Sequence, residues 1–229
     1  MKNEKETLFS RKSLKYDAIL YDFDGTLVDT IPLILKCFHI AFEEVLGIRK
    51  DDKDILATIG LPLWTAFREY DEETQRKLHD AYIRANDLYL PTDVRIFPGI
   101  HEGLSAVADL GVVQGVVTSK RRDPALFTMR QFDLEKYFSV LVTREDTTEH
   151  KPAPAPIFFA AGKLGIADPK RILFVGDSIH DLICSRNAGT DSAAVGWTYM
   201  PKDELASLSP TYWLENLSAL SCILTEREL

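Results

Sequence analysis

Short apolar runs alternate with helical patterns along most of the chain. Strands are expected at Ala18–Tyr21, Val112–Val117, Val140–Thr143, Ile172–Val175 and 192–196, and helices at 100–110, 123–132, ahead of Gly165 and ahead of Gly189. Strands that alternate with helices pair in parallel, and the helices then cover both faces of the sheet. We therefore expect an α/β fold built on a parallel sheet.

One long block after the first strand departs from this alternation. From residue 31 onward, apolar positions recur at helical spacing, with Thr30 as a candidate cap and Gly47 as the end of the first helix. Further helices are expected at 51–59, 63–70 and 72–90, and a final helix at 215–226. The all-helical block predicts an inserted second domain, residues 31–97, in a core of residues 1–30 and 98–229.

Composition narrows the class of protein. The 229 residues are 45% hydrophobic and 27% charged, with a net charge of −8, so we expect an ordered chain that is no general nucleic-acid binder and has no affinity for anionic membranes. Three widely spaced cysteines favour reduced thiols, and no Cys/His cluster indicates zinc. Residues 1–15 are polar, unlike a signal peptide, and no apolar run is long enough to span a bilayer. These features predict a cytoplasmic protein, either a monomer or a homodimer.

Polar residues end three of the predicted strands. Asp22 and Asp24 follow the first, Thr118 the second and Asp177 the fourth. Ligands of open α/β sheets bind beyond these carboxyl ends. Asp22 and Asp24 are two apart, so both would point to one side if the extended form continues. Three carboxylates at one edge favour Mg²⁺, although an isolated Asp-X-Asp-Gly could be only a solvated turn.

Two further segments offer groups that bind anions. Lys151 precedes Pro152 at the start of a predicted helix, where a bound anion would relieve the conflict between the cation and the helix dipole. Thr118 and Ser119 offer hydroxyl and backbone donors, or could merely cap the next helix. Asp181 lies four residues after Asp177 and could also serve as an acid at a helix start.

Four motifs, in order, are similar to those of the haloacid dehalogenase superfamily of phosphatases. They are Asp22-Phe-Asp24-Gly25-Thr26-Leu27-Val28-Asp29-Thr30, Val116-Val117-Thr118-Ser119-Lys120, Lys151-Pro152, and Gly176-Asp177-Ser178-Ile179-His180-Asp181. The resemblance implies a modified Rossmann core with sheet order 3-2-1-4-5 and a small helical cap formed by the inserted block.

The resemblance also implies the role of each motif residue. Asp22 would be the nucleophile that forms an aspartyl-phosphate, and Asp24 the general acid and then the base. The transferring phosphoryl group would be bound by Thr118 and Lys151, together with Gly25, Thr26 and Ser119. Asp22, Asp177 and the main-chain carbonyl of Asp24 would bind Mg²⁺, and Asp181 would support that site.

Asp24 is typical of the phosphatases and phosphomutases of this superfamily. The phosphomutases carry a cap arginine shortly after a glycine that matches Gly60, whereas here Gly60-Leu-Pro-Leu63 is followed by no arginine until Arg68. Thr118-Ser119-Lys120-Arg121 is similar to the phosphoglycolate phosphatase and PpaX-like pyrophosphatase branch. We therefore expect hydrolysis of a phosphoglycolate-like monoester, or alternatively of pyrophosphate.

Other classes of function have less support. A phosphomutase like β-phosphoglucomutase would need the cap arginine, which this chain lacks. A non-catalytic binding protein should have lost its nucleophile, which is present here. A dinucleotide-dependent dehydrogenase would need a Gly-X-Gly-X-X-Gly turn after the first strand, where this chain has Asp24-Gly25-Thr26.

Overall fold

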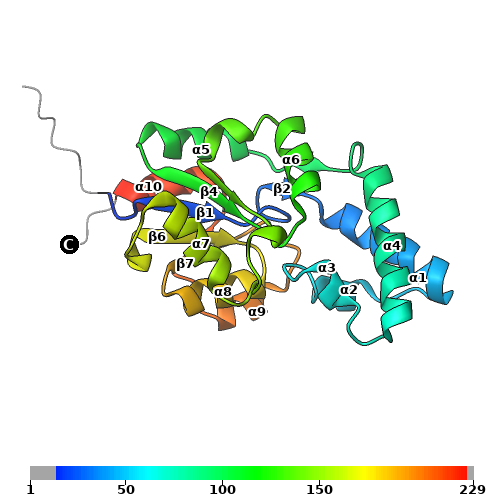
Figure 1. Cartoon of the computed structure of the whole chain (residues 1–229). Coiled ribbons are helices and arrows are strands. Elements are labelled where there is room, and N and C mark those ends of the chain that lie inside the picture. Colours follow the sequence, from blue (N-terminus) through cyan, green and yellow to red (C-terminus); the bar gives the residue numbers. More distant parts are fainter. Residues whose placement is uncertain (1–13, 226–229) are drawn as a thin grey trace, which may run out of the picture.

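The computed structural model describes residues 14–225, which fold around a six-stranded parallel sheet (Figure 1). Its spatial order is β5-β4-β1-β6-β7-β8. The strands are β1 (Ala18–Tyr21), β4 (Val113–Val117), β5 (Val140–Val142), β6 (Ile172–Gly176), β7 (Asp191–Val195) and β8 (Tyr212–Leu214). The predicted α/β class and the implied order 3-2-1-4-5 are confirmed, with one further strand at the β7 edge.

The two faces of the sheet carry separate hydrophobic clusters. Ile19 and Tyr21 of β1 belong to one cluster, and Leu20 belongs to the other, because successive side chains of a strand point to opposite faces. Helices α5 (Ile100–Asp109) and α10 (Leu220–Thr225) cover the first face, and α7 (Ala155–Leu164) and α8 (Ile179–Ala188) cover the second. Burial on both faces explains why these strands are continuous apolar runs.

Four helices form a layer beyond the carboxyl end of the sheet, on the right in Figure 1. They are α1 (Ile31–Leu46), α2 (Asp52–Leu56), α3 (Leu63–Ala66) and α4 (Glu72–Tyr89). We call them the helical layer. Helices α1 and α4 pack on each other, with Phe38, Phe42 and Tyr82 among their buried contacts. Gly47 ends α1 in the left-handed conformation, as predicted.

The inserted block is not wholly helical, and this part of the prediction was wrong. Two short strands, β2 (Val28–Asp29) and β3 (Arg95–Ile96), pair in antiparallel fashion where the chain enters and leaves the helical layer. Both are too short to leave an alternating pattern in the sequence. The helices expected at 51–59 and 63–70 are also shorter than predicted.

The end of the chain differs from the prediction as well. The expected helix at 215–226 is replaced by β8, a 3₁₀ turn (Leu217–Ala219) and α10, while α9 (Lys202–Ser207) was not predicted. Asn216 accepts a hydrogen bond from the backbone N–H of Ala219, so this side chain starts the turn where a continuous helix was expected.

The remaining helix of the core is α6 (Arg122–Gln131), which follows β4. The polar segment 1–15 falls almost entirely outside the described residues, as does the last position of the helix predicted at 215–226. Within 14–225, every helix is too short or too polar to be a membrane span.

Candidate active site

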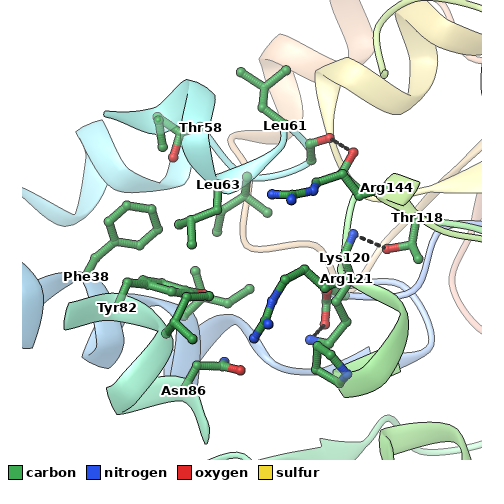
Figure 2. A pocket seen from close by; sticks show the side chains of 18 of the residues that line it. Phe38, Thr58, Leu61, Leu63, Tyr82, Asn86, Thr118, Lys120, Arg121 and Arg144 are labelled. Atoms are coloured by element: carbon green, nitrogen blue, oxygen red, sulfur yellow. Dashed lines mark hydrogen bonds and ion pairs between the residues drawn. The ribbon is translucent and has the colours of Figure 1, made fainter. Parts of the chain in front are cut away.

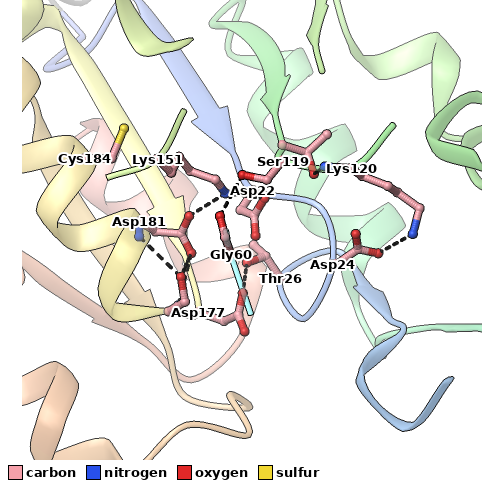
Figure 3. A network of polar contacts seen from close by, with 12 residues as sticks. Asp22, Asp24, Thr26, Gly60, Ser119, Lys120, Lys151, Asp177, Asp181 and Cys184 are labelled. Carbon is pink, nitrogen blue, oxygen red and sulfur yellow. Dashed lines mark hydrogen bonds and ion pairs between the residues drawn. The ribbon is translucent and has the colours of Figure 1, made fainter. Parts of the chain in front are cut away.

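Asp22 lies just beyond the end of the central strand β1, and a buried lysine holds its carboxylate. Its backbone N–H donates to the Val175 carbonyl at 2.8 Å, which extends the sheet pairing by one residue. The Lys151 Nζ lies 2.7 Å from Asp22 Oδ1 and 2.7 Å from Asp181 Oδ1 (Figure 3). All three side chains are almost fully buried. The structure therefore brings together Asp22, Lys151 and Asp181, which belong to three motifs that lie far apart in the sequence.

Burial and like charge dominate the electrostatics of this cluster. Burial raises the pKa of Asp22, Lys151 lowers it and Asp181 raises it again, for a net value of about 7. Burial would lower the pKa of Lys151, but the carboxylates of Asp181 and Asp22 outweigh burial and hold it above its usual range. The pKa of Asp177 is raised well above normal by burial and by both neighbouring acids. One lysine thus faces more negative charge than it can balance.

Asp177 is the feature that fits a cation. Thr26 donates its hydroxyl to Asp177 Oδ1 at 2.9 Å, whereas Oδ2 is buried and has no hydrogen-bond partner within residues 14–225. Oxygens of Asp22, Asp177 and Asp181 lie within 4.8 Å of one another. Gly25 has φ +84°, and a Cβ there would overlap the Asp177 carboxylate, so only glycine leaves this space open. A hard divalent cation with oxygen ligands would satisfy the orphaned oxygen.

Asp181 supports the site more than it offers a free ligand. Its Oδ2 accepts from the Ser178 N–H at 3.0 Å and from the Ser178 hydroxyl at 2.6 Å, which closes a capping box at the start of α8. Its Oδ1 is already paired with Lys151. This arrangement fits the supporting role expected for Asp181.

Asp24 faces the same cavity as Asp22 but pairs with a different lysine. Its Oδ1 accepts from Thr30 Oγ1 at 2.7 Å and from Lys120 Nζ at 2.8 Å. Both aspartates line one pocket, and each pairs with its own lysine (Figure 3). Thr30 was expected to cap α1 with its side chain. It does not, because its hydroxyl donates to Asp24 instead.

A pocket separates this cluster from the helical layer (Figure 2). Asp22, Asp24, Thr118 and Ser119 line the core side, and the wall formed by the helical layer is mostly apolar. The Ser119 hydroxyl donates to the Gly60 carbonyl at 2.6 Å and so joins the two sides. The Thr118 hydroxyl accepts from the Lys120 N–H at 3.2 Å. The pocket gives substrate access to both aspartates.

Two residues that line the pocket, Lys120 and Arg144, were not predicted from the sequence as part of the site. Lys120 directly follows Thr118-Ser119, but no sequence signal indicated Arg144. Trp64 is 41% exposed and is not among the lining residues. Arg121 lines the pocket, whereas Arg122 pairs with Asp146.

Comparisons with known proteins agree with this geometry. The family model for haloacid dehalogenase-like hydrolases matches residues 19–195. The chain is 34% identical over 204 residues to a candidate pyrophosphatase PpaX of Caldanaerobacter subterraneus subsp. tengcongensis, covering 89% of this chain and 92% of the relative. It is 31% identical to the pyrophosphatase PpaX of Anoxybacillus flavithermus, covering 92% and 98%. A candidate haloacid dehalogenase-like hydrolase from Bacteroides fragilis superposes with a TM-score of 0.83 at 26% identity, covering 90% of this chain and all of that one.

The parallel sheet, with a buried aspartate–lysine pair at the end of its central strand, and the matches to these proteins place the chain among hydrolases of the phosphatase type. This chain belongs to the haloacid dehalogenase-like hydrolase family. The predicted family and the predicted class of enzyme, a phosphatase of that family, are confirmed.

Proposed function

We propose that the protein is a Mg²⁺-dependent phosphohydrolase that acts through an aspartyl-phosphate on Asp22. The observation that carries this proposal is the position of the Asp22 carboxylate, which is buried beside Lys151 yet lines the pocket. A carboxylate needs no base to attack, but it needs its charge balanced as a phosphate approaches.

The cation would be held by the carboxylates of Asp22 and Asp177 and by the main-chain carbonyl of Asp24, with Asp181 in support. The orphaned Asp177 Oδ2 supports this assignment. When bound, Mg²⁺ supplies positive charge that offsets the charge of the phosphate and of the carboxylates.

The chain's own residues supply the remaining chemistry. An Asp22 carboxylate oxygen attacks phosphorus, the bond from phosphorus to the leaving oxygen breaks, and Asp24 donates a proton to that oxygen. A water then attacks the same phosphorus, Asp24 takes its proton, and phosphate departs with Asp22 restored. Lys151 and Thr118 would bind the transferring oxygens, together with the backbone at Gly25, Thr26 and Ser119. Thr26 has a second task, because its hydroxyl orients Asp177.

We further propose that residues 31–97 form a cap domain over a core of residues 1–30 and 98–229. The pairing of β2 with β3 and the Ser119–Gly60 hydrogen bond support this division, since both lie between the two parts. A cap that closes would exclude bulk water during transfer. Cys37 and Cys184 are buried free thiols, which fits a reducing cytoplasm.

Two kinds of substrate are candidates, a small phosphomonoester and pyrophosphate. The pocket suits a small phosphomonoester such as phosphoglycolate, and the names of the relatives favour pyrophosphate. A sugar phosphomutase has less support, because the pocket wall from the helical layer carries no charged side chain among the residues that the structure describes.

The test is phosphate release from a panel of p-nitrophenyl phosphate, phosphoglycolate, pyrophosphate, hexose phosphates and nucleoside monophosphates, with Mg²⁺ and with EDTA. We expect Mg²⁺-dependent release that falls by on the order of 10³-fold or more in Asp22→Asn, since an amide is a poor nucleophile. Release by Asp22→Asn at a rate near that of the wild type would refute the mechanism.

A further inference from the structure

Three cations line the pocket, and they are not equivalent. Lys120 is bound to Asp24 at 2.8 Å, and Arg121 contacts Asp87 at 3.4 Å. Arg144 is half-buried, and no carboxylate in residues 14–225 lies within ion-pair distance of it. Figure 2 shows its guanidinium pointing into the pocket, toward Leu61 and Leu63. A half-buried guanidinium without a partner is poised to bind an anion.

The backbone around Arg144 is fixed, so its position is not that of a free surface side chain. Arg144 begins a 3₁₀ turn (Arg144–Asp146) that Thr143 and Asp146 close as a capping box. Its N–H donates to the Lys120 carbonyl at 3.1 Å, which ties it to the loop that follows β4. The acids beside it are already used, because Asp146 pairs with Arg122 and Glu145 accepts from the Arg122 N–H.

The wall of the pocket that faces the core side offers no positive charge among the described residues. Among the described residues, the side chains that line the pocket from the helical layer and from the loop between α2 and α3 are all uncharged; they are Ile34, Phe38, Thr58, Ile59, Leu61, Leu63, Ala66, Tyr82, Ile83 and Asn86. An anion on the leaving group would therefore find its partner on the core side. In the proposed function Lys151 binds the transferring phosphoryl group, and Lys120 and Arg121 are paired with acids. Arg144 is therefore the cation left for the leaving group.

We propose that Arg144 is a specificity-determining residue that binds a second anionic group, carried by the leaving part of the substrate. The enzyme would therefore select small phosphorylated compounds whose leaving group carries a carboxylate or is itself a phosphate. This inference rests on the proposed function and names the substrate class of that same site.

The experiment compares matched substrates in wild type, Arg144→Gln and Arg144→Lys. Phosphoglycolate carries a carboxylate on the leaving group, 2-hydroxyethyl phosphate is its uncharged counterpart, and pyrophosphate carries a phosphate. We expect Arg144→Gln to lower kcat/KM about 10- to 100-fold for the anionic substrate that the enzyme uses, but less than about 3-fold for 2-hydroxyethyl phosphate and p-nitrophenyl phosphate. Arg144→Lys should restore part of the loss, since it keeps the charge without the planar fork.

Arg130→Gln is the matched control, because it removes an exposed arginine paired with Glu135 on α6, away from the pocket. It should leave all the ratios unchanged. A selective loss with phosphoglycolate identifies a carboxylate as the second anion, and one with pyrophosphate identifies a phosphate.

Two results would overturn the inference while leaving the proposed function in place. One is an unchanged kcat/KM for every anionic substrate in Arg144→Gln. The other is an equal loss for charged and uncharged leaving groups, which would assign Arg144 to the transferring phosphate or to folding. A wild type that releases phosphate only from hexose phosphates or nucleoside monophosphates would also overturn the inference and leave the proposed function in place. If it releases phosphate from no compound of the full panel, the proposed function itself fails, and the inference fails with it.

Discussion

Replacing Asp22 with asparagine should stabilise the metal-free protein even as it abolishes turnover. In the folded chain, Asp22, Asp177 and Asp181 share one buried lysine, Lys151. Burial and this crowding raise the pKa of Asp22 from 3.8 to about 7. A carboxyl that holds its proton more tightly in the folded state than in the unfolded state makes folding less favourable at high pH.

The sign and the size follow from that shift. Below about pH 4, Asp22 is protonated in both states and costs nothing. Between about pH 4 and 7 the unfolded chain loses its proton first, so the free energy of unfolding falls as pH rises, and above pH 7 the loss is complete. A rise from 3.8 to about 7 corresponds to a loss of about 4 kcal/mol, of which about 3 kcal/mol accrues between pH 5 and pH 8. Asp22→Asn has no proton to lose at this position.

The assay is urea unfolding in EDTA at pH 5, 6, 7 and 8. The free energy of unfolding of Asp22→Asn should exceed that of the wild type, by a margin that widens toward pH 8 by up to about 3 kcal/mol. Asp17→Asn is the control of opposite sign, because Arg171 holds the pKa of Asp17 below its usual range, so this variant should be slightly less stable at pH 8. A wild type as stable as Asp22→Asn at pH 8 would show that the cluster carries no net electrostatic cost.

Two more predictions concern the groups around Asp22. Lys151→Met should lower the free energy of unfolding at pH 8 by about 3–5 kcal/mol, because Asp22 and Asp181 lose their buried cation. Lys151→Arg should recover part of this loss. Urea curves of Lys151→Met that coincide with those of the wild type would contradict the prediction. Ser119→Ala removes the hydrogen bond to the Gly60 carbonyl and should raise KM about 2- to 10-fold in steady-state kinetics, whereas Ser119→Thr keeps the donor. An unchanged KM in the alanine variant would mean that this hydrogen bond does not hold the proposed cap over the pocket.

The core of the fold could be predicted because its strands are buried on both faces. Ala18–Tyr21 and Ile172–Gly176 are unbroken apolar runs, and each is followed directly by an aspartate at the carboxyl end of the strand. The pairing of these ends follows from parallel topology, so the meeting of Asp22 with Asp177 was predictable. Strands β2 and β8 are two and three residues long, and so short a segment leaves no period to detect.

The partners of the acids could not be predicted in the same way. The pairing of Asp24 with Lys120 depends on the direction of the chain after Tyr21, which local pattern does not set. Arg144 enters the pocket from a 3₁₀ turn that follows β5. Its significance comes from the absence, among the described residues, of an acid that pairs with it, because Asp146 and Glu145 bond to Arg122 instead. That pairing is a property of three-dimensional packing.

The antiparallel pairing of β2 with β3 also bears on how the chain folds. Val28 lies opposite Ile96 and Asp29 opposite Arg95, so the two ends of the stretch between them are neighbours in space. The chain entropy lost on closing a loop grows only slowly with the length of the loop. The β2–β3 pair can therefore close this loop whatever sequence the loop contains. We therefore expect the helical layer to be exchangeable. Joining Asp29 to Arg95 through a short turn should leave a sheet that still folds, and grafting another helical insert at the same two residues should yield a chimera with the same chemistry and a different choice of substrate.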